Sequence, residues 1–92
     1  KFDAVVKRIE AAVESMPPRT AQVLTLRLGL FGRHEQTLEE IGDRYEVTRE
    51  RIRQIETAGL ALLEQQLGFS PDEIREILRI REELAALVSS ST

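Results

Sequence analysis

Apolar residues recur every three to four positions along most of the chain, and short segments with glycine, proline or polar residues interrupt them. This spacing is typical of amphipathic helices. The first apolar stretch runs to about Ser15, where Met16-Pro17-Pro18 stops it. A short second helix is expected after these prolines, because proline suits a first helical turn, and it should run until Gly29, where the chain turns.

The middle of the chain predicts two helices joined by a tight turn. Thr37 and Glu40 have the spacing of a capping box, in which each side chain accepts a hydrogen bond from the other residue's backbone at a helix start. This third helix carries Gly42, which leaves room for close approach of another backbone. The pattern restarts at Thr48, which suits the N-cap of a fourth helix that runs to about Leu67.

The last part of the chain contains a second capping box. Ser70 is placed as N-cap, Pro71 as the first helical residue and Glu73 as the reciprocal acceptor, so a fifth helix is expected from Pro71 to Val88. An isolated helix of this length is marginal in water. We therefore expect its apolar stripe to be buried on the domain or on a second copy. The stripe consists of Ile74, Ile77, Leu78, Leu84, Leu87 and Val88.

These elements predict an all-α fold, a small helical domain of about five helices with a central helix-turn-helix. The chain has 92 residues, which is enough for one small core. We expect the domain to occupy residues 1–69. Residues 70–92 would form an additional C-terminal amphipathic helix that packs on the domain or is used for a partner.

Composition narrows the possible functions. The 13 Lys and Arg residues against 16 Asp and Glu give a net charge of −3, so nucleic-acid binding would have to come from a local patch. The absence of cysteine excludes a disulfide framework and fits a reducing compartment. Neither a membrane span nor a signal peptide is evident, so a soluble cytoplasmic protein is expected. The start at Lys1 indicates a fragment of a longer protein.

A local basic patch is found where the fourth helix begins. With about 100° per residue, one face of this helix is polar and the opposite face is apolar. Arginine, glutamine and glutamate can all hydrogen-bond to base edges, and a helix-turn-helix presents such groups to the major groove. The same pattern also fits a solvated face with intrahelical ion pairs, and the pattern alone leaves both interpretations open. The polar face consists of Arg49, Glu50, Arg53 and Gln54, and the apolar face of Ile52, Ile55, Leu62 and Leu63.

Three segments between Pro17 and Leu63, PPRTAQVLTLRLGL, TLEEIG and VTRERIRQIE, resemble region 4 of bacterial RNA polymerase sigma factors of the primary type. The resemblance implies sequence-specific DNA binding in transcription initiation, with recognition of the minus-35 promoter element and docking on the flap of the polymerase β subunit. It implies base contacts by Arg49, Glu50 and Gln54. It implies DNA-backbone contacts by Arg19, Arg27, Thr37, Leu38, Arg51 and Arg53, with backbone donors of Thr37 and Leu38 directed at a phosphate.

The chain departs from that family in two places. Ala58, Gly59 and Glu64 stand in the recognition helix where the family has basic residues, and a capped, acidic helix follows it. The alternative function is therefore a protein-interaction module with a sigma-like fold and weakened DNA contact. Such a module would dock on polymerase, bind an anti-sigma protein or self-associate. The expected partners are duplex promoter DNA, RNA polymerase core and a regulatory protein or second copy at the C-terminal helix, with no membrane.

Catalytic and metal sites are not expected. His34 stands in a polar loop without carboxylates at ligand spacing. The adjacent pairs Glu39-Glu40 and Glu82-Glu83 would point about 100° apart on a helix, which does not suit acid-base catalysis. We therefore expect neither enzyme activity nor a cofactor.

Overall fold

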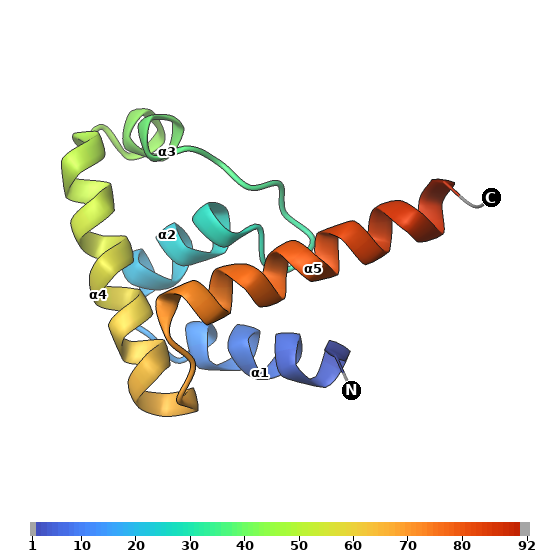
Figure 1. Ribbon diagram of the computed structural model, residues 1–92. Helices are drawn as coiled ribbons and strands as arrows, with labels where there is room; N and C mark the ends of the chain where they lie inside the picture. Colours follow the sequence, from blue (N-terminus) through green and yellow to red (C-terminus); the bar gives the residue numbers. More distant parts are fainter. Residues whose placement is uncertain (1, 91–92) are drawn as a thin grey trace.

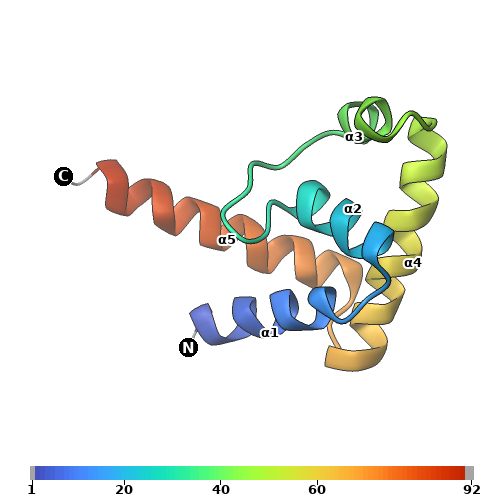
Figure 2. The same cartoon turned by 180° about the vertical axis from the view of Figure 1, so that it is seen from behind.

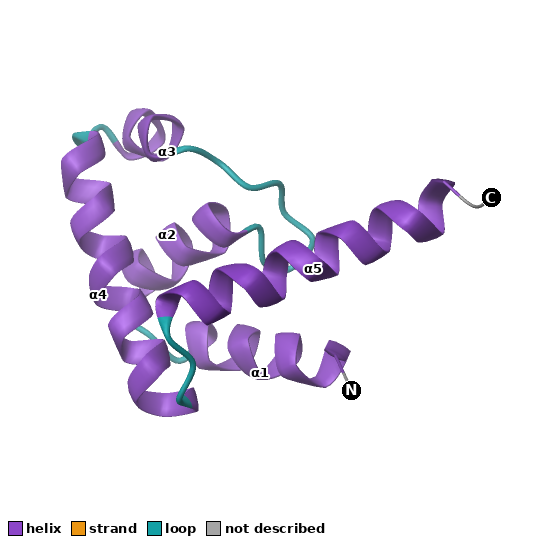
Figure 3. Ribbon diagram, in the orientation of Figure 1, coloured by secondary structure: helices purple, strands orange, loops and turns teal. Residues whose placement is uncertain are grey.

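The computed structural model describes residues 2–90, and this part of the chain forms five helices and no strand (Figures 1 and 3). The predicted all-α fold is confirmed. No helix in the described range is long and apolar enough to cross a membrane. The helices are α1 (Phe2–Glu14), α2 (Pro18–Leu28), α3 (Leu38–Tyr45), α4 (Arg49–Leu67) and α5 (Pro71–Ser90).

Both predicted capping boxes are present. At the start of α3, the Glu40 N–H donates to Thr37 Oγ1 at 3.1 Å and the Thr37 N–H donates to Glu40 Oε1 at 2.8 Å. At the start of α5, the Glu73 N–H donates to Ser70 Oγ at 3.1 Å and the Ser70 N–H donates to Glu73 Oε1 at 2.8 Å. These bonds satisfy donors that a helix start leaves open, so each helix begins where the sequence predicts.

Glycine fixes two helix ends and one close contact. Gly29 ends α2 with φ 65° and Gly68 ends α4 with φ 80°, in the left-handed region that favours glycine. Gly42 lies within α3, and a Cβ there would be 2.7 Å from the carbonyl oxygen of Val47. The missing side chain therefore lets the turn after α3 fold back against the helix, as the sequence predicts.

Two groups of buried apolar side chains hold the helices together. The larger core joins α1, α2, α4 and α5, and the smaller core joins α2, α3 and α4. Because the smaller core fixes α3 against α4, the helix-turn-helix is anchored to α2. The larger core contains Val6, Ile9, Ala12, Val13, Met16, Leu24, Leu30, Leu60, Leu63, Ile74 and Leu78, and the smaller one Val23, Leu26, Ile41, Ile52 and Ile55.

Helix α5 crosses the body of the domain and then extends beyond it (Figures 1 and 2). In its first half Ile74 and Leu78 are buried in the larger core. In its second half the side chains of Leu84, Leu87 and Val88 are 49%, 64% and 68% exposed. Only the first half of the predicted apolar stripe is therefore buried on this chain.

Candidate nucleic-acid interface

Helices α3 and α4 form a helix-turn-helix with a short, well-defined turn. Glu46 follows α3 in the left-handed conformation, with φ 59°. The Val47 N–H donates to the Gly42 carbonyl at 2.9 Å, and Thr48 caps α4 by accepting from the Arg51 N–H at 3.1 Å. The predicted N-cap and the predicted break between the two helices are confirmed. This turn fixes the direction in which α4 leaves α3.

The first turns of α4 present a polar face to solvent. Ile52 and Ile55 are buried in the smaller core, and the polar side chains around them are exposed, as the helical wheel predicts. Figure 1 shows that this end of α4 lies beside α3, away from the crossing with α5. The face is therefore open to a macromolecule as large as DNA. Its exposed residues are Arg49, Glu50, Arg51, Arg53 and Gln54.

Several side chains of this face pair with one another along the helix. Glu50 accepts two hydrogen bonds from Arg53, at 3.0 Å from Nε and 2.6 Å from Nη2. These bonds hold the pKa of the Glu50 carboxyl below its usual value and raise the pKa of Arg53. Arg51 Nη1 donates to Gln54 Oε1 at 3.4 Å. The intrahelical pairs of the alternative interpretation are thus present, on a face that also has the geometry of a recognition helix.

Arg19 lies on α2 beside the end of α3. Its guanidinium carbon is 4.3 Å from the centroid of the Tyr45 ring, a cation–π contact. Arg19 is exposed and Tyr45 half-buried, so the ring positions the guanidinium at the surface next to the helix-turn-helix.

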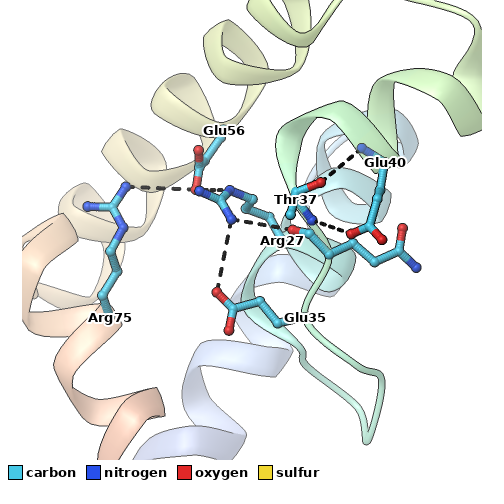
Figure 4. Close-up of polar contacts among 7 residues, drawn as sticks. Arg27, Glu35, Thr37, Glu40, Glu56 and Arg75 are labelled. Carbon is cyan, nitrogen blue, oxygen red and sulfur yellow. Dashed lines mark hydrogen bonds and ion pairs between the residues drawn. The ribbon is translucent and has the colours of Figure 1, made fainter.

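Arg27 is also on α2, but its guanidinium faces the protein (Figure 4). Nε lies 3.2 Å from Glu56 Oε2 without the alignment of a hydrogen bond, so this contact is ionic. Nη1 lies 4.0 Å from Glu35 and donates to the Gln36 carbonyl at 3.3 Å. Arg75 of α5 approaches the same Glu56 oxygen at 3.7 Å. One carboxylate of α4 therefore joins α2 and α5.

Glu56 was not predicted as a site residue, although the sequence contains a signal for it. With about 100° per residue, Glu56 falls between Leu63 and Leu60 on the wheel of α4. A carboxylate on an apolar arc needs a cationic partner when buried. The helical wheel could thus have predicted that Glu56 is paired, but not with which arginine.

The start of α3 is less open than the resemblance implies. The Thr37 N–H and hydroxyl are both used in the capping box, and Leu38 is half-buried. The predicted phosphate contacts at Thr37 and Leu38 remain predictions. His34 lies exposed in the loop before α3, and among residues 2–90 no cluster of His, Asp and Glu is arranged to hold a metal ion.

Comparison with known proteins places the helix-turn-helix in a family. Residues 12–65, from the end of α1 to near the end of α4, match the family described as sigma-70, region 4. The chain is 51% identical over 51 residues to RNA polymerase sigma factor RpoD of Neisseria gonorrhoeae, covering 55% of this chain and 8% of that protein. It is 51% identical over 55 residues to RNA polymerase sigma factor SigA of Nostoc sp., covering 60% of this chain and 14% of that protein.

A further relative, RNA polymerase sigma factor SigA of Clostridium acetobutylicum, is 42% identical over 62 residues, covering 67% of this chain and 16% of that protein. The chain thus spans only a small part of the length of these curated relatives. The family match ends at residue 65, before α5 begins at Pro71.

Proposed function

The chain belongs to the sigma-70 region 4 family, and on that premise we propose that it binds duplex promoter DNA sequence-specifically in transcription initiation. The observation that carries the proposal is the exposed polar face at the start of α4, on a helix anchored by its own apolar core. A face of this kind suits the major groove, where a recognition helix reads the minus-35 element. The function is binding without chemistry, and it would be exercised in the cytoplasm.

The proposed base contacts come from Arg49, Glu50 and Gln54. Arginine can donate two hydrogen bonds to guanine, glutamine can pair with adenine, and glutamate can accept from the amino group of cytosine. Glu50 reaches a base only after it releases Arg53. Because exposed pairs of this kind contribute little to stability, the exchange has a low cost. The same rearrangement frees Arg53 for a phosphate.

The proposed DNA-backbone contacts surround this face. Arg51 and Arg53 flank it on α4, and Arg19 extends it onto α2. Arg27 directs Nε and Nη1 at protein oxygens, so it would reach a phosphate through Nη2. At the start of α3, the backbone of Thr37 and Leu38 would contribute the positive end of the helix dipole.

We further propose that RNA polymerase core, through the flap of its β subunit, is a partner of this chain. The second candidate function is a protein-interaction module in which DNA contact is weakened. It is supported by the net charge of −3 and by the exposed apolar residues in the second half of α5. DNA binding is the leading proposal because a docking surface has no evident need for the polar face of α4.

The decisive experiment distinguishes contacts to DNA bases from contacts to the DNA backbone. A duplex is first selected from a random library by the wild-type chain at low salt, because salt weakens phosphate contacts and the chain is acidic overall. Arg49→Ala should then weaken binding to the selected duplex by about 1–3 kcal/mol, roughly 5- to 150-fold, and relax specificity at one position. Arg51→Ala should weaken binding to all duplexes alike and reduce the log-log salt slope by about 1.

A matched control is Arg79→Ala, which removes an exposed arginine from α5, a helix that crosses the domain away from the start of α4 (Figure 1). It should leave binding to the selected duplex unchanged. The proposal fails if the library yields no preferred sequence, at low salt and with polymerase core supplied, and if Arg49→Ala behaves like Arg79→Ala. That outcome would favour the protein-interaction module.

A further inference from the structure

Helix α5 has two apolar faces. One face, with Ile74 and Leu78, is buried in the larger core. The other lies roughly 120° around the helix and runs from Ile77 to Leu87. On this second face Ile77 is half-buried and packs partly against the larger core, Ile80 is half-buried, and Leu84 and Leu87 are 49% and 64% exposed. We call these four residues, Ile77, Ile80, Leu84 and Leu87, the α5 seam.

The spacing of the seam is that of a coiled coil. Its residues are separated by three, four and three positions, which corresponds to heptad positions a, d, a and d. A helix that only covers a globular core has a broader stripe with a period near 3.6. The seam therefore has the geometry to pack against a second helix in addition to the packing of α5 on its own domain.

We propose that the α5 seam pairs with the same seam of a second copy of this chain, as a short parallel coiled coil. The choice of occupant and orientation rests on the charges that flank the seam. Glu76 and Glu83 occupy heptad position g, and Arg81 occupies position e. In a parallel pair, position g of one helix faces position e of the next heptad in the partner, which places Glu76 opposite Arg81 on both sides of the two-fold axis.

An antiparallel pair has the opposite charge pattern. There, positions e face each other and positions g face each other, so Arg81 would meet Arg81 and Glu83 would meet Glu83. Like charges at these positions are unfavourable. Arg81 lies at the edge of the seam, where its Nη2 donates to the Gly29 carbonyl at 2.9 Å and its Nη1 lies 4.0 Å from Glu10 of the same chain. Glu76 is paired with Arg79, so the intermolecular pair forms only when Glu76 and Arg81 exchange these partners, and exposed pairs of this kind contribute little to stability. The parallel orientation is therefore the favourable one.

The structure sets the expected strength of this pair. The seam covers about two heptads, fewer than the roughly three to four that a sustained coiled coil shows, so the dimer is weak. Since the first half of α5 is packed on the domain, the helix is already formed in the monomer. Association therefore does not include the free-energy cost of forming the helix. We expect a dissociation constant of about 0.1–1 mM. Both recognition faces stay exposed, because they lie at the far end of α4 (Figure 1).

Sedimentation equilibrium of the 92-residue chain tests the pairing, over concentrations from about 10 µM to about 1 mM. The wild-type chain should show a mass that rises toward that of a dimer. The double variant Leu84→Glu, Leu87→Glu should stay monomeric with an unchanged far-UV circular dichroism spectrum, because both side chains are exposed in the monomer. The matched control Ala86→Glu adds a charge to the same turns outside the seam and should still dimerise.

The orientation is tested by disulfide formation, for which the chain is convenient because it has no cysteine. Leu87→Cys should cross-link with itself in a glutathione redox buffer, since a parallel pair places the two positions opposite each other. A mixture of Ile80→Cys and Leu84→Cys should give no mixed disulfide, because those positions face each other only in an antiparallel pair. The proposal is overturned if the wild-type chain stays monomeric throughout, if Ala86→Glu is as monomeric as the double variant, or if only the mixed disulfide forms.

Discussion

Replacing Glu56 with glutamine removes one negative charge from the contact that joins α2, α4 and α5. The substitution keeps the size of the side chain, so it creates no cavity. What it removes is the ionic attraction to Arg27 at 3.2 Å and to Arg75 at 3.7 Å. The two arginines are then left close together without the carboxylate between them.

The burial of these groups sets the magnitude. Losing one partner of a fully buried ion pair costs about 3–5 kcal/mol, and an exposed pair contributes about 0.2–1 kcal/mol. The Glu56 side chain is 6% exposed, Arg27 28% and Arg75 49%, so this contact lies between the two limits. We expect Glu56→Gln to lower the free energy of unfolding by about 2 kcal/mol. For a domain of this size, that corresponds to a decrease in Tm of roughly 8–16 °C.

Thermal melting by circular dichroism and urea unfolding would measure the effect, with the urea m value expected to stay constant. The matched control is Glu64→Gln, the same substitution at an exposed position of the same helix, which should change stability by less than about 0.5 kcal/mol. Equal melting of the two variants would refute the reasoning. A more stable Glu56→Gln chain would mean that the desolvation of Glu56 and Arg27 outweighs their attraction.

Two further predictions concern the helix-turn-helix. The pKa of Glu50 should lie below its usual value in an NMR titration and return toward it in Arg53→Gln, since hydrogen bonds from Arg53 cause the shift. Because the folded-state pKa is lowered, the stabilisation from this pair should be present at neutral pH and lost as the pH falls through that pKa, and an unshifted Glu50 would contradict the pairing. Gly42→Ala should destabilise the chain by about 1–3 kcal/mol in urea unfolding, because the new Cβ would lie 2.7 Å from the Val47 carbonyl oxygen. A stability equal to that of the wild type would show that the turn can move aside at no cost.

The sequence predicted the features that depend on neighbouring residues. The capping boxes at Thr37 and Ser70 and the left-handed end at Gly68 involve groups within a few positions of one another, so the sequence spacing specifies the geometry. The division of α4 into a polar and an apolar face also follows from one helical period. Helical-wheel patterns and helix-capping residues can therefore predict these parts of the fold and of the candidate interface.

Contacts between distant segments could not be predicted in the same way. Glu56 meets Arg27 and Arg75, which lie on two other helices, and no local rule selects those two arginines from the others in the chain. The stripe of α5 has the same periodicity before and after Leu78, so its spacing does not show where the domain surface ends. That boundary depends on the lengths and the crossing of α1, α4 and α5, which only the assembled fold determines.

Tyr45, the residue whose ring contacts Arg19, also makes the chain convenient for fluorescence spectroscopy. The sequence contains one tyrosine and no tryptophan, so tyrosine emission comes from a single place, the end of α3 against the smaller core. Far-UV circular dichroism, in contrast, records all five helices of residues 2–90. If the two signals change at the same urea concentration, the helix-turn-helix unfolds as one unit with α1, α2 and α5. If the emission changes first, the helix-turn-helix opens while the other helices stay folded, and the natural chain reports this without an added label.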